Sequence, residues 1–397
     1  MIELQKRIIQ LSDKYFDEVV SLRRTIHANP ELAFDEHETA KLVEASLEKS
    51  GVSVRTGVAK TGIIGTLHGK GKGGSKVVAL RSDLDALPIQ EATGLAFASK
   101  NSGKMHACGH DAHTAIGLGA AMILAELRDE FSGEVRFLFQ PSEERNPGGA
   151  PKMIEDGALD GVDEIYGLHV IAQHDAGMLG FCEGEMMASA DEIYITIRGR
   201  SGHGARPHAT VDPIVTSAQV ILALQTLVSR NLDPFSQGVI TIGSVHGGFA
   251  PNIIPEEVKL VGTLRSMTKQ WRDYAHTRIK EITEGIASAG GATCEVMIDK
   301  GYPVLRNEPL KTLFAENCAQ ELFGGERVFK AERMMGAEDF AYYLEKVPGT
   351  FYRLGIRNIA KGITADIHND HFTIDEDSMR AGVAMQAYLA LRALSVE

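Results

Sequence analysis

The spacing of hydrophobic residues divides the chain into alternating helices and strands. Apolar residues recur at helical spacing over residues 3–26 and again over 36–48, so both segments are predicted helices. Strands are predicted at 52–58, 62–67, 77–80, 133–140, 165–168 and 350–354, and further helices at 115–127, 309–323, 338–346 and 378–393. Because strands and helices alternate, the pattern indicates an α/β domain with a mainly parallel sheet covered by helices.

The pattern changes over residues 188–298. Apolar and polar residues alternate there, as in Ile193, Ile195 and Ile197, which is typical of strands with one exposed face. The predicted order is strand 193–197, helix 213–229, strands 239–245 and 258–264, helix 269–288 and strand 294–298. This β-α-β-β-α-β order predicts a ferredoxin-like α+β domain. We therefore expect residues 1–187 and 299–397 to form one discontinuous domain, with 188–298 inserted into it.

The composition is that of a soluble protein with more than one domain. The 397 residues exceed one typical core, and 44% hydrophobic with 24% charged residues is ordinary. A net charge of −12 argues against nucleic acid or an anionic membrane as partner. The sequence has no apolar run of the ~18 residues that a membrane span needs, and no signal-peptide pattern. The four cysteines lack paired spacing, so we expect a cytoplasmic protein.

Reactive side chains gather in one short stretch, Met105–Thr114. It holds three histidines, a cysteine and an aspartate, groups that are costly to bring together unless a cation lies between them. Cys108 and His110 are two residues apart, so in extended backbone both point to the same side and can share a metal. The alternative is a helix start capped by Asp111 and Thr114, with the histidines merely polar.

Other candidate groups lie at or just beyond the ends of predicted strands: Asp83, Asp85, Glu143, Glu144, His169 and, in a later loop, His368. Such strand ends are where α/β proteins place their sites. Adjacent side chains of extended backbone point opposite ways, so Glu144 would face a metal and Glu143 a substrate. The alternative for Asp83 and Asp85 is a pair of solvated loop aspartates.

These residue types indicate a catalytic rather than a structural metal site. A structural zinc takes four ligands from tight, cysteine-rich spacings, whereas these candidates extend from Asp83 to His368 and are mostly histidine and carboxylate. Amide hydrolysis needs a nucleophile at neutral pH, and a divalent metal provides one by lowering the pKa of bound water toward ~7. It also needs a base that is not a metal ligand, a role that suits Glu143.

The motifs resemble those of the aminoacylase/carboxypeptidase family of dinuclear metallohydrolases, in the branch of hippurate hydrolases, N-acyl-L-amino acid amidohydrolases and auxin-conjugate hydrolases. The resemblance extends from RRTIH at Arg23 and PEL at Pro30 to the final helix. Its specific motifs are RSDLDALP (81–88), MHACGHDAHT (105–114), FQPSEE (139–144), GLHV (167–170) and SGHGARPH (201–208). It implies a three-layer α/β/α zinc-peptidase-like catalytic domain and an inserted ferredoxin-like lid that forms dimers.

The resemblance also implies a metal site. Two divalent ions per subunit would be held by Cys108, His110, Glu144, His169 and His368. Cys108 would bridge them, where the wider family uses a carboxylate, and Glu143 would be the general acid/base. Asp83-Leu84-Asp85 replaces the family's His-x-Asp pair, and Asp85 would accept a hydrogen bond from a ligand imidazole. Thiolate favours Zn²⁺, while the other ligands also suit Mn²⁺, Co²⁺ or Ni²⁺.

In the lid, His203 of SGHGARPH would polarise the scissile carbonyl, often across a dimer interface in this family. Asn252 and Arg265 would hold the substrate carboxylate, which suits the bidentate arginine fork. The expected function is hydrolysis of N-acyl or N-aroyl L-amino acids, or of short peptides, by metal-activated water, in a homodimer or homotetramer formed through the lid. The alternatives are a metallo-carboxypeptidase or dipeptidase and, from another class, a catalytically silent metal-binding protein.

Overall fold

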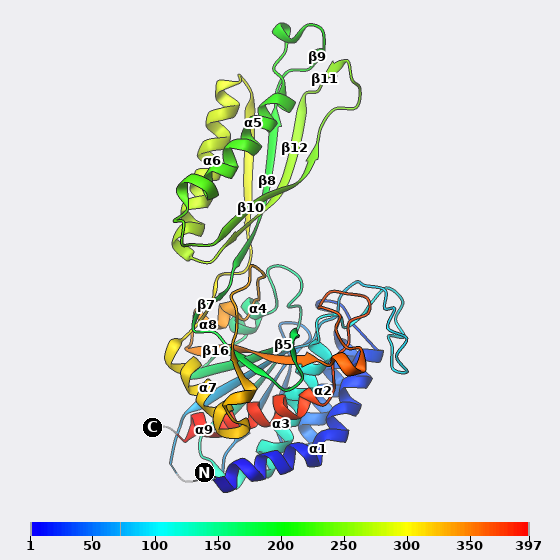
Figure 1. Cartoon of the computed structure of the whole chain (residues 1–397), viewed down its shortest axis with the longest axis vertical. Helices are drawn as coiled ribbons and strands as arrows, with labels where there is room; N and C mark the ends of the chain where they lie inside the picture. The colour runs from blue at the N-terminus through cyan, green and yellow to red at the C-terminus, as the bar shows by residue number, and fades with distance from the viewer. Residues whose placement is uncertain (1, 72, 396–397) are drawn as a thin grey trace. The chain divides into compact units, whose positions relative to one another are not determined.

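In the computed structural model, which describes residues 2–71 and 73–395, the chain folds into two compact units (Figure 1). The first comprises the chain up to Gly184, Arg306–Glu332 and Asp339–Glu397, and the second comprises Glu185–Leu305 and Arg333–Glu338. Each unit has its own sheet and its own hydrophobic core. Within the described ranges, every helix is too short or too polar to cross a membrane.

The first unit is built on an eight-stranded sheet of order β1-β2-β4-β3-β5-β16-β6-β15. Its strands are β1 (Ser53–Val58), β2 (Gly62–His68), β3 (Val77–Asp83), β4 (Glu134–Gln140), β5 (Glu164–Asp175), β6 (Leu179–Phe181), β15 (Val328–Lys330) and β16 (Gly349–Arg357). The central strands β4, β3, β5 and β16 run parallel, as the sequence predicted. The sheet is nevertheless mixed, because β1 and β2 join one side of it antiparallel and β6 pairs antiparallel with β16.

Helices form layers on either side of this sheet, which confirms the predicted α/β class (Figure 1). They are α1 (Ile2–Ala28), α2 (His37–Lys49), α3 (His110–Glu126), α4 (Ala150–Glu155), α7 (Pro309–Phe323), α8 (Ala341–Leu344) and α9 (Ser378–Leu394). Helices α1, α3 and α9 pack together, and α3 is buried from His110 to Leu124. A helix that is apolar on all sides belongs in a core, so its N-terminus is held firmly.

Two predicted helices have different bounds in the structure. The helix expected at 115–127 begins earlier, at His110, after Gly109 in the left-handed region with φ 89°. The helix expected at 338–346 shortens to α8, because the buried Asp339 side chain accepts hydrogen bonds from Arg81 (2.8 Å) and Gln140 (2.7 Å) instead of continuing a helix. The first change places the histidine-rich motif on a helix N-terminus.

The second unit has the strand order of a ferredoxin-like fold, β10-β12-β8-β13, with all neighbours antiparallel. Its elements are β8 (Ser189–Arg198), β9 (Gly202–His203), α5 (Pro213–Thr226), β10 (Gly238–His246), β11 (Ile253–Ile254), β12 (Glu257–Ser266), α6 (Lys269–Ala289) and β13 (Thr293–Lys300); a separate pair is formed by β7 (Gly184–Met187) and β14 (Leu305–Asn307). The alternating Ile193, Ile195 and Ile197 are buried in one core with residues of α5 and α6. Strands β10 and β13 are the edges of this sheet.

Candidate metal centre

Of the groups of potential metal ligands among the described residues, two share Cys108. The ligand atoms of Cys108, His110 and His169 lie within 4.8 Å of one another, and so do those of Cys108, Glu144 and His368. His110 is the first residue of α3 and Cys108 lies two residues before it. His169 is on β5, Glu144 follows β4 and His368 precedes α9. Helix α3 and the parallel strands β4 and β5 therefore bring together residues that are far apart in sequence.

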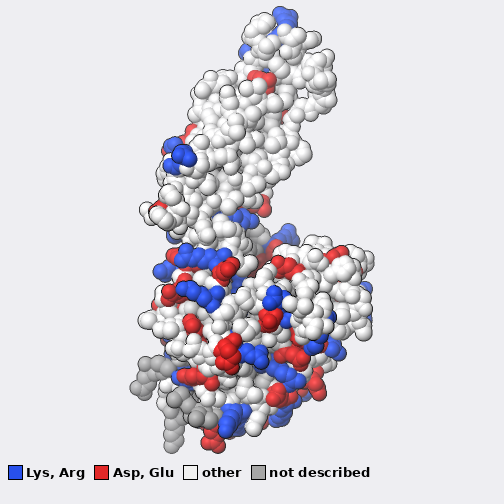
Figure 2. Space-filling model, in the orientation of Figure 1, with Lys and Arg blue, Asp and Glu red and all other residues white. Residues whose placement is uncertain are grey.

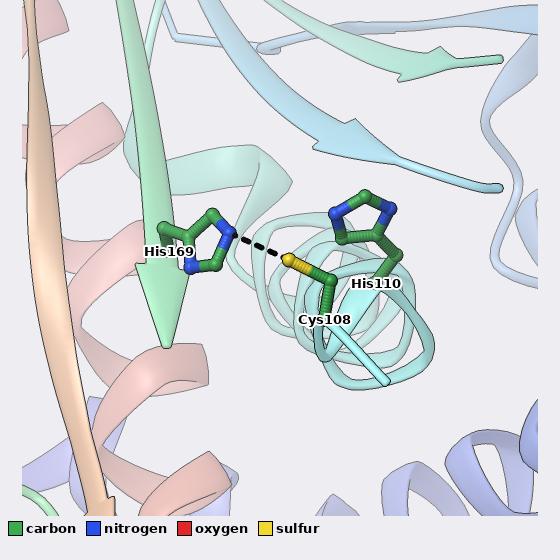
Figure 3. Close-up of side chains that lie close together, drawn as sticks. All are labelled: Cys108, His110 and His169. Atoms are coloured by element: carbon green, nitrogen blue, oxygen red, sulfur yellow. Dashed lines mark hydrogen bonds between the residues drawn. The ribbon is translucent and has the colours of Figure 1, made fainter. Parts of the chain in front are cut away.

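His169 points its free ring nitrogen at Cys108. Figure 3 shows His169 Nε2 directed at Cys108 Sγ, and the two atoms are 3.4 Å apart. The other nitrogen, Nδ1, lies 2.7 Å from the Val170 carbonyl oxygen, which can only accept, so Nδ1 carries the proton. Burial lowers the pKa of His169 well below its usual value, which keeps the ring neutral. A neutral imidazole with an unprotonated Nε2 is the form that binds metals.

His110 brings a second buried ring to the cluster. Its Nδ1 donates to the Asp85 carbonyl oxygen at 2.8 Å, while Nε2 makes no hydrogen bond to any described residue. Buried polar atoms are rarely left in this state, and a metal ion would satisfy Nε2. Burial by itself lowers the pKa of His110, but the charge of Asp83 and the hydrogen bond to Asp85 raise it to about 10. The cluster thus has an excess of negative charge that favours a cation.

Glu144 and His368 form the other side of the cluster. His368 Nε2 lies 3.1 Å from Glu144 Oε1, and this hydrogen bond raises the pKa of His368. His368 has φ 61°, unusual for a residue with a Cβ atom, and its backbone N–H donates to the Ala107 carbonyl oxygen at 2.7 Å. That bond fixes His368 beside the segment that carries Cys108.

Cys108 needs a cation if it is to be a thiolate. Burial raises the pKa of its thiol well above the usual value, and the nearby Glu144 and Glu143 raise it further. A metal ion reverses this by stabilising the thiolate directly. The donor set of one thiol, three imidazoles and a carboxylate therefore fits one or two bound divalent ions.

Glu143 and Glu144 are placed by backbone contacts that the sequence does not reveal. Asp85 is buried and accepts the N–H groups of Glu143 at 2.9 Å and of Glu144 at 3.0 Å. Its carboxylate also lies 3.3 Å from His110 Nδ1. Both glutamates come near His110 Nε2, at 4.0 Å for Glu143 and 3.9 Å for Glu144, but of the two only Glu144 is grouped with Cys108 and His368. Glu143 is thus beside the ligand groups that share Cys108.

Both carboxylate oxygens of Asp83 have partners within the protein. Its two carboxylate oxygens lie 2.7 Å from His113 Nδ1 and 2.5 Å from Arg81 Nη1. His113 Nε2 in turn accepts the Val170 N–H at 2.9 Å, so both nitrogens of His113 are used. The ligand atoms of Asp83, His110 and His113 also lie within 4.8 Å of one another, but these contacts already occupy both oxygens of Asp83 and both nitrogens of His113, which favours a supporting role. The sequence left open a supporting role for His113 but did not indicate one for Arg81, although Arg81 lies inside a quoted motif.

The three candidates in the second unit fall into two separate places. His203 on β9 lies opposite Ile253 of β11, and the adjacent Gly204 N–H donates to the Asn252 carbonyl oxygen at 2.8 Å. Arg265 is near the far end of β12, paired with Ala190 of β8. At the usual rise per residue, the β12 segment from Glu257 to Arg265 spans about 26 Å. The structure therefore brings His203 and Asn252 of one chain together but leaves Arg265 apart from them. Figure 1 shows β9 and β11 side by side at one end of this unit.

The chain is similar to known hydrolases over nearly its whole length. It is 40% identical to thermostable carboxypeptidase 2 of Saccharolobus solfataricus, over 95% of each chain. It is also 40% identical to N-acetyl-L-cysteine deacetylase of Bacillus subtilis, over 91% of this chain and 85% of that protein. A solved structure of the YXEP protein of Bacillus subtilis, described as a dinuclear metal binding peptidase from the M20 family, is 36% identical and superposes with a TM-score of 0.85, covering 97% of this chain and all of that one.

These similarities confirm the family that the motifs indicated. The sequence model of peptidase family M20/M25/M40 matches residues 79–392, which include the helix α3 motif and all the candidate ligands. The chain therefore belongs to peptidase family M20/M25/M40 and is a metal-dependent amidohydrolase or peptidase.

Proposed function

We propose that this enzyme hydrolyses the amide bond of N-acyl or N-aroyl L-amino acids with two divalent metal ions. The observation that carries the proposal is the pair of ligand groups that share Cys108. A thiolate sulfur can bind two ions at once, so one ion would be held by His110 and His169 and the other by Glu144 and His368. A relative of the same fold is described as binding two metals.

The ions would supply a water of lowered pKa and a Lewis acid for the substrate carbonyl. We expect Zn²⁺ to bind best because of the thiolate, and Mn²⁺, Co²⁺ or Ni²⁺ to suit the remaining ligands. Glu143, buried beside His110 and outside the ligand groups that share Cys108, would take up the proton of the attacking water and deliver it to the leaving nitrogen. Asp85 would hold Glu143, Glu144 and His110 in place for this transfer.

We further propose that residues 188–298 act as a lid that recognises the substrate. His203 would donate to the oxygen of the scissile carbonyl, and Asn252 and Arg265 would bind the α-carboxylate. Because Arg265 is about 26 Å along β12 from the His203 end, one lid does not offer all three groups to one small substrate. Two subunits that exchange lid contacts would bring all three groups to one substrate, with His203 and Asn252 coming from the partner.

A surface suited to such a homodimer is present in the second unit. Helix α5 exposes Ile214, Val215 and Leu222, and the edge strand β10 exposes Val239 and Val245. Figure 2 shows few charged side chains on the visible face of this unit. Exposed apolar side chains beside an unpaired strand edge favour self-association, so we propose a homodimer, or a homotetramer, through this edge. The four cysteines are free, and we expect the enzyme to work in the reducing cytoplasm.

The alternative substrates are peptides, because one relative is named a carboxypeptidase and another a deacetylase. A substrate panel on metal-free enzyme reloaded with each metal decides between them. We expect hippurate and N-acetyl amino acids to be hydrolysed faster than dipeptides. Faster release of C-terminal residues from peptides would make it a carboxypeptidase. If neither N-acyl amino acids nor peptides are hydrolysed with any of the metals, the protein is a catalytically silent metal-binding protein.

A further inference from the structure

Three consecutive backbone N–H groups lead into the proposed catalytic glutamates, and two buried carboxylates hold all three. Asp85 accepts the N–H groups of Glu143 and Glu144, as described above. The preceding N–H, that of Ser142, donates to Oε1 of Glu36 at 2.9 Å. Glu36 is 0% exposed and lies just before α2, 106 residues away along the chain. Its contact with this loop is therefore a product of the fold.

Glu36 is itself fixed through both carboxylate oxygens. Oε1 also accepts the Phe34 N–H at 3.0 Å, and Oε2 accepts the hydroxyl of Thr61 at 2.5 Å. A carboxylate held by three donors in a buried site has no freedom to follow a moving loop. It therefore acts as a rigid acceptor for the Ser142 N–H.

Capping of helix α2 does not explain Glu36. Although Glu36 occupies the position before the helix, its side chain makes no capping hydrogen bond. Glu31 does that work: its carboxylate accepts the N–H groups of Glu38 at 3.0 Å and Thr39 at 2.9 Å. The Glu36 side chain is thus free to turn inward to Ser142.

Ser142 needs to be held. Its φ of 55° is in the left-handed region, which is unfavourable for a residue with a Cβ atom. Its hydroxyl is buried and makes no hydrogen bond to any described residue, so the side chain does not stabilise this conformation. The bond from its backbone N–H to Glu36 is the polar contact that does.

We propose that Glu36 is a positioning residue for Glu143 and Glu144, which it aims by holding the Ser142 N–H. The roles of those two glutamates rest on the proposed function. Without the acceptor, Ser142 would relax out of the left-handed region and turn the following peptide. The carboxylates of Glu143 and Glu144 would then leave their places near His110, at a cost to the proton transfer and to metal binding.

The test compares two substitutions at Glu36 in the full-length, metal-loaded enzyme. Glu36→Gln keeps an oxygen for Ser142 and Phe34 and places an amide N–H toward Thr61. Glu36→Met keeps the volume and removes the acceptor. The matched control is Glu164→Met, which removes another buried carboxylate, at the first residue of β5. If Glu36→Met does not fold, Thr61→Val, which removes one anchor of Glu36, tests the same contact more gently.

Hydrogen exchange of the peptide covering residues 141–145 is the readout that does not depend on activity. We expect Glu36→Met to speed exchange there about tenfold or more, to lower kcat about tenfold or more at saturating metal, and to leave KM nearly unchanged. Thr61→Val should move exchange and kcat in the same direction by a smaller factor. Glu36→Gln should remain within about threefold of wild type in both, and Glu164→Met should leave both the local exchange and kcat unchanged.

The proposal is overturned if Glu36→Met has the exchange rate and kcat of the wild type. It is also overturned if exchange becomes faster throughout the first unit rather than at 141–145, because that is expected of a merely structural residue. Where Thr61→Val replaces Glu36→Met in the test, a wild-type exchange rate and kcat in Thr61→Val overturn the proposal as well. Failure of the proposed function can be distinguished from failure of the Glu36 proposal. If the proposed function is wrong, the wild type hydrolyses no N-acyl amino acid, and the exchange comparison still decides whether Glu36 holds the 141–145 loop.

Discussion

Arg23 and Asp111 form an ion pair, 2.7 Å from Nε to Oδ2, in which both side chains are almost completely buried. Asp111 directly follows the candidate ligand His110, and the same Oδ2 lies 2.8 Å from His27 Nδ1. Burial would raise the pKa of Asp111, but Arg23 and His27 hold it far below its usual range. The pair thus ties helix α1 to the N-terminus of α3, where the metal motif begins.

We expect Arg23→Ala to lower the free energy of unfolding by about 3–5 kcal/mol, because it leaves the Asp111 charge buried without its main partner. Urea unfolding measures this. Arg24→Ala is the matched control: Arg24 pairs with Glu376 but is 48% exposed, so its loss should cost less than about 1 kcal/mol. Equal losses of unfolding free energy in the two variants would show that the buried ion pair contributes no more to stability than the exposed one.

Glu143→Gln should keep both metal ions and lower kcat by several orders of magnitude, because it removes the proton carrier but no ligand. Glu144→Gln should instead lower metal content, since Glu144 is grouped with Cys108 and His368. Metal analysis beside steady-state kinetics separates the two. Loss of metal in Glu143→Gln with retention in Glu144→Gln would mean that the two roles are exchanged.

The sequence predicted which residues gather but not how they are held. Asp83 and Glu144 are predictable because polar residues that end or follow parallel strands meet at one edge of a sheet. His169 does not end its strand as predicted, since β5 continues to Asp175, but the pairing of Gly167 with Arg81 near the end of β3 still brings it to this edge. The predicted start of α3 is too late, because the apolar run that indicates the helix begins only at Ala115, and a helix start within the histidine-rich motif was the alternative. The left-handed Gly109 and the burial of α3 override that local signal.

The contacts that hold the ligands in place cannot be predicted from the sequence, because they involve backbone groups and residues far apart in the chain. Nothing in the spacing of Glu36 shows that it accepts the Ser142 N–H. Asp85 was expected beside a ligand imidazole and does contact His110, but its bonds to two backbone N–H groups were not expected. Hydrogen bonds to backbone leave no periodic pattern in a sequence. Asn252 and Arg265 were expected to bind one carboxylate together, and only the length of β12 shows that one chain keeps them apart.

Cys108→Ser should weaken binding of Zn²⁺ more than binding of Mn²⁺, because a hydroxyl replaces the soft thiolate ligand. Competition titrations with a chromophoric chelator measure both affinities. As a control, Cys318→Ser changes a buried thiol that is in none of the ligand groups and should leave both affinities unchanged. Equal affinities in wild type and Cys108→Ser would remove the thiol from the site.

The stability of the metal-free protein should depend on pH through Glu36. Burial, with the neighbouring charge of Asp85, raises the pKa of Glu36 from 4.5 to about 7. Between those values the folded protein binds a proton that the unfolded chain does not, so the contribution of Glu36 is complete below pH 4.5 and is lost as the pH rises through 7. Relative to Glu36→Gln, the wild type should lose about 3 kcal/mol over this range, measured by urea unfolding in chelator. A constant difference between the two proteins from pH 5 to 8 would contradict this.

Mixing two inactive variants tests the exchange of lid contacts between subunits. His203 is exposed on β9, at the end of the lid remote from Arg265, so we expect it to complete the partner's site. His203→Ala and Glu143→Gln should then each give a nearly inactive homodimer. In a mixed dimer one site holds the intact Glu143 of the first variant and the intact His203 of the second, and the other site lacks both. Co-expression with random pairing should therefore restore about a quarter of wild-type activity, from one working site in half of the dimers. If His203 served its own chain, every site in the mixed dimer would lack one group and mixing would restore nothing. A sizing column comes first, since a monomer in solution would exclude the cross-subunit role before any rate is measured.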